Sequence, residues 1–170
     1  MNTEPLSERK FWALISENVL LNADGSIDAT PLGEVLASKP LNEIAAFARR
    51  CWDCYSSSRT YALWGAAGLI HDGAPDDTFD YFRSWLVGRG RETFEAAIRD
   101  PDTLADVATP EALDDELYCI ASAAYQQVTG ELPSWEFSEY PDLGTPIDFT
   151  DEDSLKAFYP RLYTKFRSQV

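Results

Sequence analysis

The spacing of hydrophobic and polar residues predicts helices along most of the chain. In stretches such as 7–20 and 41–58, apolar side chains recur every three or four residues, which places them on one face of a helix. The stretch 60–70 contains no charged residue and is apolar on every side. A helix of that kind is normally surrounded by others. We therefore expect 60–70 to be the buried central helix, with Trp64 and Ala67 among the least exposed residues.

Proline, glycine and capping residues divide the pattern into about seven or eight helices. Thr109 with Pro110 combines an N-cap residue with a first-turn proline, which predicts the start of a long helix. Gly88 is typical of a helix end. Residues 131–150 contain several prolines and scattered aromatic residues, which predicts an irregular segment with its aromatic side chains facing inward. The prediction is an all-α fold in which residues 1–170 form a single compact domain.

The charge of the chain is strongly negative and unevenly distributed. The sequence has 14 basic and 29 acidic residues, a net charge of −15, and residues 100–155 contain 15 of the acids and no Lys or Arg. Nucleic-acid binding needs clustered Lys and Arg, so we expect no nucleic-acid partner. The acidic third is either a solvated face that keeps the protein soluble or a docking surface for a basic protein partner. Candidate docking residues are Asp114, Asp115 and Glu116.

Cysteine usage and hydropathy indicate a cytoplasmic protein. An odd number of cysteines, three, and a charged start without a signal peptide point to reduced thiols. No apolar run reaches about 18 residues, so we expect no contact with a membrane. Cys51 and Cys54 have the spacing of a redox or zinc motif, but only Cys119 and His71 could complete such a site. We expect no metal and no cofactor, and a redox role for the Cys51 and Cys54 pair stays open.

The stretch 72–106 is the densest in acids, arginines and aromatic residues. Asp76 and Asp77 are the expected N-caps of its first predicted helix, 76–88, and Gly88 is expected to stop that helix. In this helix Arg83 falls inside the apolar face, whereas Asp80 and Ser84 face outward. A guanidinium cannot be buried without a partner, so Arg83 must meet a carboxylate unless a ligand supplies the negative charge. The expected partners are Asp76, Asp77 and the acids between 95 and 102.

The same stretch offers a candidate ligand site. Arginines and a helix N-terminus that converge on one point would bind a small anionic ligand. The competing interpretation is structural, with capped helices, aromatic contacts and one arginine–carboxylate pair. His71 is the sole histidine and has no convincing nucleophile beside it, so no catalytic residue is assigned. The candidate ligand-binding residues are Trp64, His71, Asp76, Asp77, Arg83, Trp85 and Arg91.

Four short motifs resemble an uncharacterised bacterial family of the actinomycete type, a domain of unknown function catalogued under the number 4240. They are FWALI at 11–15, LWGAA at 63–67, DDTFDYFRSWLVG at 76–88 and DPDTLA at 100–105. The likeness extends over most of the chain and is weakest between 131 and 153. The resemblance implies a helical domain. It transfers no catalytic residue, because the family has no established activity.

Two classes of function are consistent with the sequence. The first is a cytoplasmic, acidic, helical binding or accessory protein that docks a basic protein partner through its acidic third. The second is a small-molecule-binding protein or an enzyme with its site among the acids, arginines and tryptophan of the 76–91 block. Whether the protein is an enzyme stays open at this point.

Overall fold

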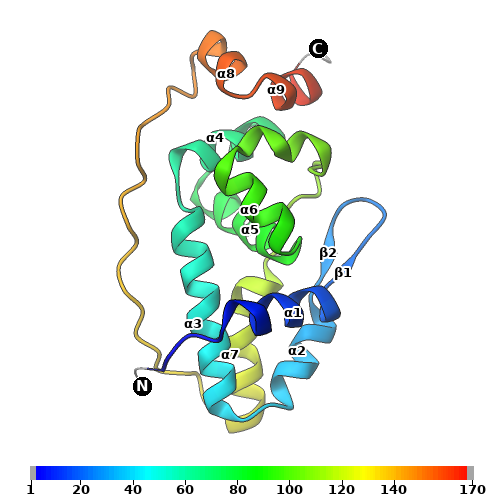
Figure 1. The fold of residues 1–170 in the computed structure, drawn as a ribbon, viewed down its shortest axis with the longest axis vertical. Coiled ribbons are helices and arrows are strands. Elements are labelled where there is room, and N and C mark those ends of the chain that lie inside the picture. Colours follow the sequence, from blue (N-terminus) through cyan, green and yellow to red (C-terminus); the bar gives the residue numbers. More distant parts are fainter. Residues whose placement is uncertain (1–2, 168–170) are drawn as a thin grey trace.

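The computed structural model describes residues 3–167 and confirms the all-α class. Two short strands, β1 (Leu20–Leu21) and β2 (Ile27–Asp28), pair antiparallel, with Leu20 opposite Asp28 and Leu21 opposite Ile27. Helices make up the rest of the regular structure in this part of the chain (Figure 1). They are α1 (Glu8–Asn18), α2 (Thr30–Ala37), α3 (Leu41–Ser58), α4 (Tyr61–Ile70), α5 (Asp76–Gly88), α6 (Arg91–Arg99), the 3₁₀ helix η1 (Pro101–Asp106), α7 (Glu116–Thr129), α8 (Glu152–Phe158) and α9 (Pro160–Phe166).

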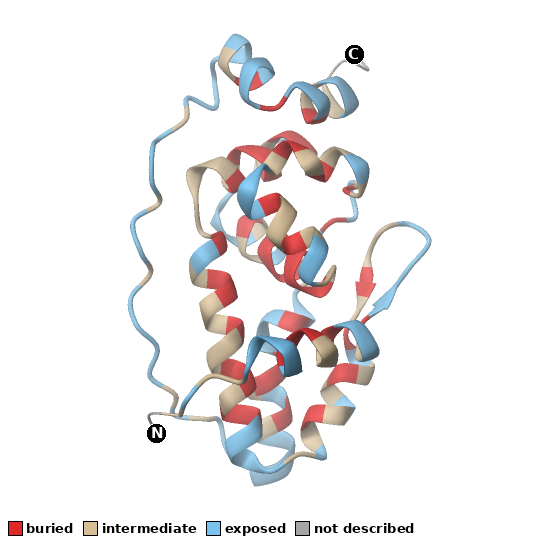
Figure 2. Ribbon diagram, viewed as in Figure 1, coloured by how far each residue is buried: buried red, intermediate tan, exposed pale blue. Residues whose placement is uncertain are grey.

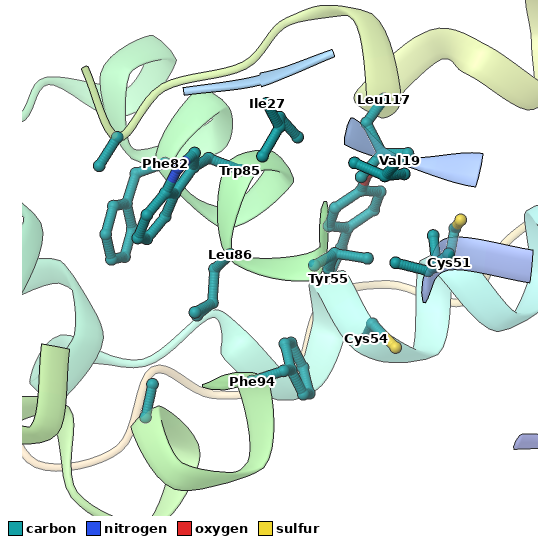
Figure 3. Packing of buried hydrophobic residues seen from close by; sticks show 14 of the residues in the cluster. Val19, Ile27, Cys51, Cys54, Tyr55, Phe82, Trp85, Leu86, Phe94 and Leu117 are labelled. Carbon is teal, nitrogen blue, oxygen red and sulfur yellow. The ribbon is translucent and has the colours of Figure 1, made fainter. Parts of the chain in front are cut away.

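The helices form two groups that share α5. Helices α1, α2, α3 and α7 pack together at one end, and α4, α6, η1, α8 and α9 pack at the other (Figure 1). Helix α5 contacts α3 and α7 in the first group and α4 and α6 in the second. Its residues from 82 to 88 are all buried, which makes it the element that connects the two halves of the core (Figures 2 and 3).

Helix α4 is apolar and mostly buried, as its composition predicts, because the C-terminal helices cover it. Tyr159, between α8 and α9, donates a hydrogen bond from its hydroxyl to the carbonyl of Ala62 at 2.7 Å. A Cβ at Gly65 would lie 2.4 Å from that hydroxyl oxygen, so only a glycine allows this close contact. Ala67 is fully buried as expected. The expectation for Trp64 was wrong, since this side chain is only half-buried.

The start of α7 and the conformation at the end of α5 differ from the sequence prediction. Helix α7 begins at Glu116 and not at Thr109, because the Thr109 hydroxyl bonds to the Asp24 carbonyl at 2.9 Å instead of capping a helix. Gly88 does not end α5 through a left-handed conformation. It is the last residue of α5, and Ile27 of β2 occupies the space where a Cβ would stand. The positive φ falls two residues later, at Gly90.

The first acids of α5 also play another role than expected. Pro75 is the N-cap residue, and Asp76 and Asp77 lie exposed in the first turn without a side-chain capping bond. There they stabilise the helix through its dipole. The prediction that they cap α5 was therefore wrong.

Residues 130–151 form the irregular segment that the prolines predict. The segment runs without helix or strand along one side of the molecule, from the end of α7 to α8 (Figure 1). Most of its residues are exposed (Figure 2). Trp135 and Tyr140 are half-buried as expected, whereas Phe137 and Phe149 are more exposed than predicted. The segment is thus held to the helices by some of its aromatic residues and not by all of them.

Candidate functional site

Arg83 lies in the core on α5, and its side chain is 1% exposed. One terminal nitrogen, Nη1, donates to the Tyr55 carbonyl of α3 at 2.6 Å, and the other, Nη2, bonds to the carboxylate of Asp80. The guanidinium carbon also stands 5.1 Å from the centre of the Phe79 ring and 5.3 Å from that of Tyr140, within the range of cation–π attraction. The prediction of a buried, paired arginine is therefore confirmed.

The carboxylate partner of Arg83 is not among those expected. Asp80 precedes it by three residues on the same helix, a spacing that makes side chains neighbours, and 37% of the Asp80 side chain is exposed. Asp76, Asp77 and the acids between 95 and 102 make no bond to Arg83 in the described residues. With its charge paired and two rings over it, Arg83 holds α3, α5 and the 130–151 segment together and is closed to a small anion.

A second polar contact joins α5 to the start of α7. Ser84 is fully buried, contrary to its predicted outward position. Its hydroxyl donates to Asp114 Oδ2 at 2.8 Å, and the same oxygen accepts the backbone N–H of Leu117 at 2.8 Å. Burial raises the pKa of Asp114 above its ordinary value. Asp114 thus points inward and caps α7, so it contributes little to an open acidic surface.

Three tyrosines surround these contacts. The rings of Tyr55 and Tyr118 are 5.3 Å apart, and burial raises the pKa of Tyr118 to about 12, with Tyr140 close by. The Tyr55 hydroxyl is buried and has no hydrogen-bond partner in the described residues, and burial raises its pKa as well. The phenols of Tyr55 and Tyr118 are therefore protonated at neutral pH. Neither is poised as a general base, and both contribute packing contacts to the cluster.

The structure does not bring the 76–91 block to one surface. Trp85 is fully buried, and its indole N–H donates to the Gly25 carbonyl at 2.8 Å. Arg91 is exposed at the start of α6 and pairs with Glu8 and Glu95. Asp76 and Asp77 stand at the opposite end of the 13-residue α5, about 20 Å away at 1.5 Å per residue. The side chains of the 76–91 block therefore do not converge on one ligand site.

Trp64 lies in the first half of α4, and His71 is the residue that directly follows the helix. The Trp64 indole stacks on Phe79 with 4.7 Å between ring centres and donates to the Ala74 carbonyl at 2.6 Å. It lines a cavity of about 160 Å³ together with Asp72. His71 is half-buried, its Nε2 has no partner among the described residues, and burial lowers its pKa below the ordinary 6.5. His71 is therefore a neutral imidazole at neutral pH.

Cys51 and Cys54 are buried on α3, and burial raises the pKa of both thiols, that of Cys54 to about 12. Their thiolates, the reactive form, are therefore strongly disfavoured. Cys119 on α7 is exposed. Between residues 3 and 167 no group of three or more His, Cys, Asp or Glu side chains is placed to hold a metal ion.

The acidic third divides into carboxylates with internal partners and carboxylates without them. Asp102, for example, is buried and accepts the backbone N–H groups of Arg161 and Leu162 at the start of α9. Asp106 pairs with the Arg161 side chain. Between residues 107 and 155, by contrast, no described residue takes part in an ion pair. Exposed acids without a hydrogen-bonded side chain are Glu111, Asp115, Glu116, Glu131, Glu136, Glu139 and Asp153.

Part of this surface combines carboxylates with exposed apolar side chains. Tyr81 of α5 and Tyr118 of α7 are each 39% exposed, and Leu113 between the two helices is similarly open. The backbone N–H of Asp114 donates to the Tyr81 carbonyl at 3.1 Å, which holds the turn before α7 against α5. We name the resulting patch the acidic face. Its members are Tyr81, Glu111, Leu113, Asp115, Glu116 and Tyr118.

Comparison with known proteins identifies the family. No curated protein and no solved structure matches the chain. A family model does match it over residues 6–127, from the residues before α1 to near the end of α7. The 130–151 segment, α8 and α9 follow the matched region. Because the match covers most of the chain, the protein belongs to the family described as "Protein of unknown function (DUF4240)".

Proposed function

We propose that the protein is a binding or accessory module that docks a basic protein partner on the acidic face. One observation carries the proposal. Tyr81, Leu113 and Tyr118 are partly exposed among carboxylates, and no described Lys or Arg side chain forms an ion pair with an acid between 107 and 155. Carboxylates left without internal partners are available to an external cation. The acidic face therefore offers electrostatic attraction to a basic protein and partly exposed apolar side chains for that protein to contact.

The residue types of the acidic face suit recognition of a basic surface. Tyrosine is enriched among the residues that dominate binding energy in protein interfaces, and it loses little side-chain entropy when it is covered. The surrounding carboxylates steer a positively charged partner during its approach. Exposed charge alone is enough to keep a protein soluble. The tyrosines and Leu113 among the carboxylates therefore favour a docking surface over a face that serves solubility.

A cytoplasmic location accords with this role. In the described chain the three cysteines are free thiols, and two of them are buried where oxidation is hindered. Disulfides are rare in the reducing cytoplasm. No helix between residues 3 and 167 is both long and apolar enough to cross a membrane. The bacterial, actinomycete-type origin expected from the sequence motifs stays a prediction.

Site-specific photocrosslinking tests the proposal. Tyr81 would be replaced by p-benzoylphenylalanine, the full-length chain expressed in its natural host, and the crosslinked protein identified by mass spectrometry. The control carries the same side chain at Leu21 of β1, which is also exposed. We expect one protein with a basic surface to crosslink from position 81 and not from position 21. Crosslinking of an acidic protein, equal yield from both positions, or no crosslink from position 81 would overturn the proposal.

A further inference from the structure

We propose that a cavity between α3, α7 and the 130–151 segment binds a small uncharged molecule of one or two aromatic rings. The cavity measures about 210 Å³, and its lining includes Tyr55, whose carbonyl accepts a hydrogen bond from Arg83. Helix α3 contributes Cys51, Trp52 and Tyr55 to its walls, α7 contributes Tyr118 and Ser122, and the segment contributes Trp135 and Phe137. This inference does not rest on the proposed docking function.

The chemistry of the walls selects an uncharged ligand. No Asp, Glu, Lys, Arg or His side chain from residues 3–167 lines the cavity. Moving an ion from water to such a place without a partner is strongly unfavourable. Aromatic rings from three parts of the chain offer faces and edges for stacking. The Ser122 hydroxyl makes no hydrogen bond within the described residues, so it is free to meet one polar atom of a ligand. An apolar ring with a single N–H or O–H group fits these walls.

The size of the cavity sets the size of the ligand. A protein cavity of about 150 Å³ accommodates benzene, and drug-sized ligands occupy roughly 300 Å³ or more. A space of about 210 Å³ falls between the two. Indole, with two fused rings and one N–H group, is therefore a suitable probe.

The outer wall of the cavity is a fixed part of the structure. The Phe137 ring stacks on the Trp52 ring with 5.0 Å between centres and 10° between planes. The Trp52 indole N–H donates to the Ser138 hydroxyl at 3.2 Å, and Arg49 donates to the Glu136 carbonyl at 3.1 Å. These contacts hold the 130–151 segment over α3. Trp135 and Phe137, which the segment contributes to this wall, come after residue 127, where the family match ends. The cavity therefore depends on a part of the chain beyond the matched region.

The rate at which the Cys119 thiol is alkylated shows directly whether a ligand occupies the cavity. It lines the cavity and is exposed, whereas Cys51 and Cys54 are buried, so iodoacetamide should alkylate Cys119 first. A ligand in the cavity would shield the thiol. If bound protein does not react, indole at ten times its Kd should slow alkylation about elevenfold, because only the unliganded fraction is modified. Indole-3-carboxylate carries a charge on the same ring and should require at least a tenfold higher concentration for equal protection.

Variants of the full-length chain locate the effect. Ser122→Phe places a ring in the cavity and should abolish protection of Cys119 by indole, whereas Ala123→Phe on the exposed side of α7 should leave it intact. In a second control, Cys119→Ser combined with Ser16→Cys moves the reactive thiol to exposed α1, where indole should give no protection. The unmodified chain supplies the decisive measurement even if Ser122→Phe fails to fold. Unchanged alkylation of Cys119 at saturating indole, or equal protection of the thiol at position 16, would overturn the proposal.

Discussion

The pair of Arg83 and Asp80 should respond unequally to removal of its two members. Arg83 is 1% exposed and Asp80 is 37% exposed. Replacement of Asp80 by Asn leaves a buried guanidinium without its counter-ion, and water cannot reach it unless the packing opens. Replacement of Arg83 by Met leaves a carboxylate that water already contacts. The first change should therefore cost more stability than the second.

The structure allows rough magnitudes for both changes. Removing one member of a buried ion pair costs about 3 to 5 kcal/mol, and we place Asp80→Asn near the lower end, about 3 kcal/mol, because its carboxylate is partly solvated. Arg83→Met removes one bond to the Tyr55 carbonyl, which still accepts the Ser58 hydroxyl at 3.2 Å. Methionine keeps the apolar contacts with Phe79, so the loss should be about 1 to 2 kcal/mol.

Thermal and urea unfolding measure this difference directly. For a chain of this length, about 3 kcal/mol corresponds to a fall in Tm of roughly 6 to 12 °C. Asp77→Asn is the matched control, because Asp77 is an exposed acid in the first turn of the same helix and should cost less than about 1 kcal/mol. Equal losses for the Asp80 and Asp77 variants, or a larger loss for Arg83→Met than for Asp80→Asn, would refute the reasoning.

Three further predictions concern other parts of the core. Burial lowers the pKa of His71, the sole histidine, below 6.5 in the folded protein. Below pH 6.5 the unfolded chain therefore binds a proton more readily than the folded chain, and the free energy of unfolding should fall as the pH drops from 6.5 towards the folded-state pKa. In urea unfolding, the His71→Gln variant should not show this fall in stability. A pKa of His71 at or above 6.5, measured by NMR in the folded protein, would contradict the prediction. Gly65→Ala should cost about 1 to 3 kcal/mol, and Tyr159→Phe should recover part of it, because the clash is with the Tyr159 hydroxyl; additive losses would argue against the contact. Asp102→Ala removes the acceptor at the start of α9 and should cost about 1 to 2 kcal/mol, with earlier proteolysis of the C-terminal helices; an unchanged cleavage pattern would count against it.

Burial of Arg83 could be predicted because it depends on one helix. The apolar face of 76–88 follows from 100° per residue, and Arg83 falls inside it. Its partner could have been found by the same geometry, since residues three apart are neighbours on a helix. Asp80 is predicted to face outward, but its side chain is only 37% exposed. It lies at the border of the apolar face, where an aspartate can still reach an inward arginine.

Contacts between distant segments could not be predicted in this way. Tyr140 stacks on Arg83 across 57 positions, and Ser84 meets Asp114 across 30. Nothing in the local pattern around either residue signals such a partner. The early start predicted for α7 failed for the same reason, since a tertiary bond from Thr109 to the Asp24 carbonyl replaced a local cap. The acidic face likewise depends on the fold, which separates exposed Asp115 from inward Asp114.

The dependence of association rate on salt tests the docking proposal most directly. The protein that crosslinks from position 81 would be mixed with the wild-type chain and with a variant carrying Glu111→Gln, Asp115→Asn and Glu116→Gln, which retains Asp114 as the cap of α7. Stopped-flow rates would be recorded between about 0.02 and 0.5 M salt, because a charge-steered encounter slows as ionic strength rises. We expect the wild type to lose its advantage at high salt and the variant to associate roughly three- to tenfold more slowly at low salt. Equal rates for the two chains at low salt, or wild-type rates that do not change with salt, would contradict recognition through the acidic face.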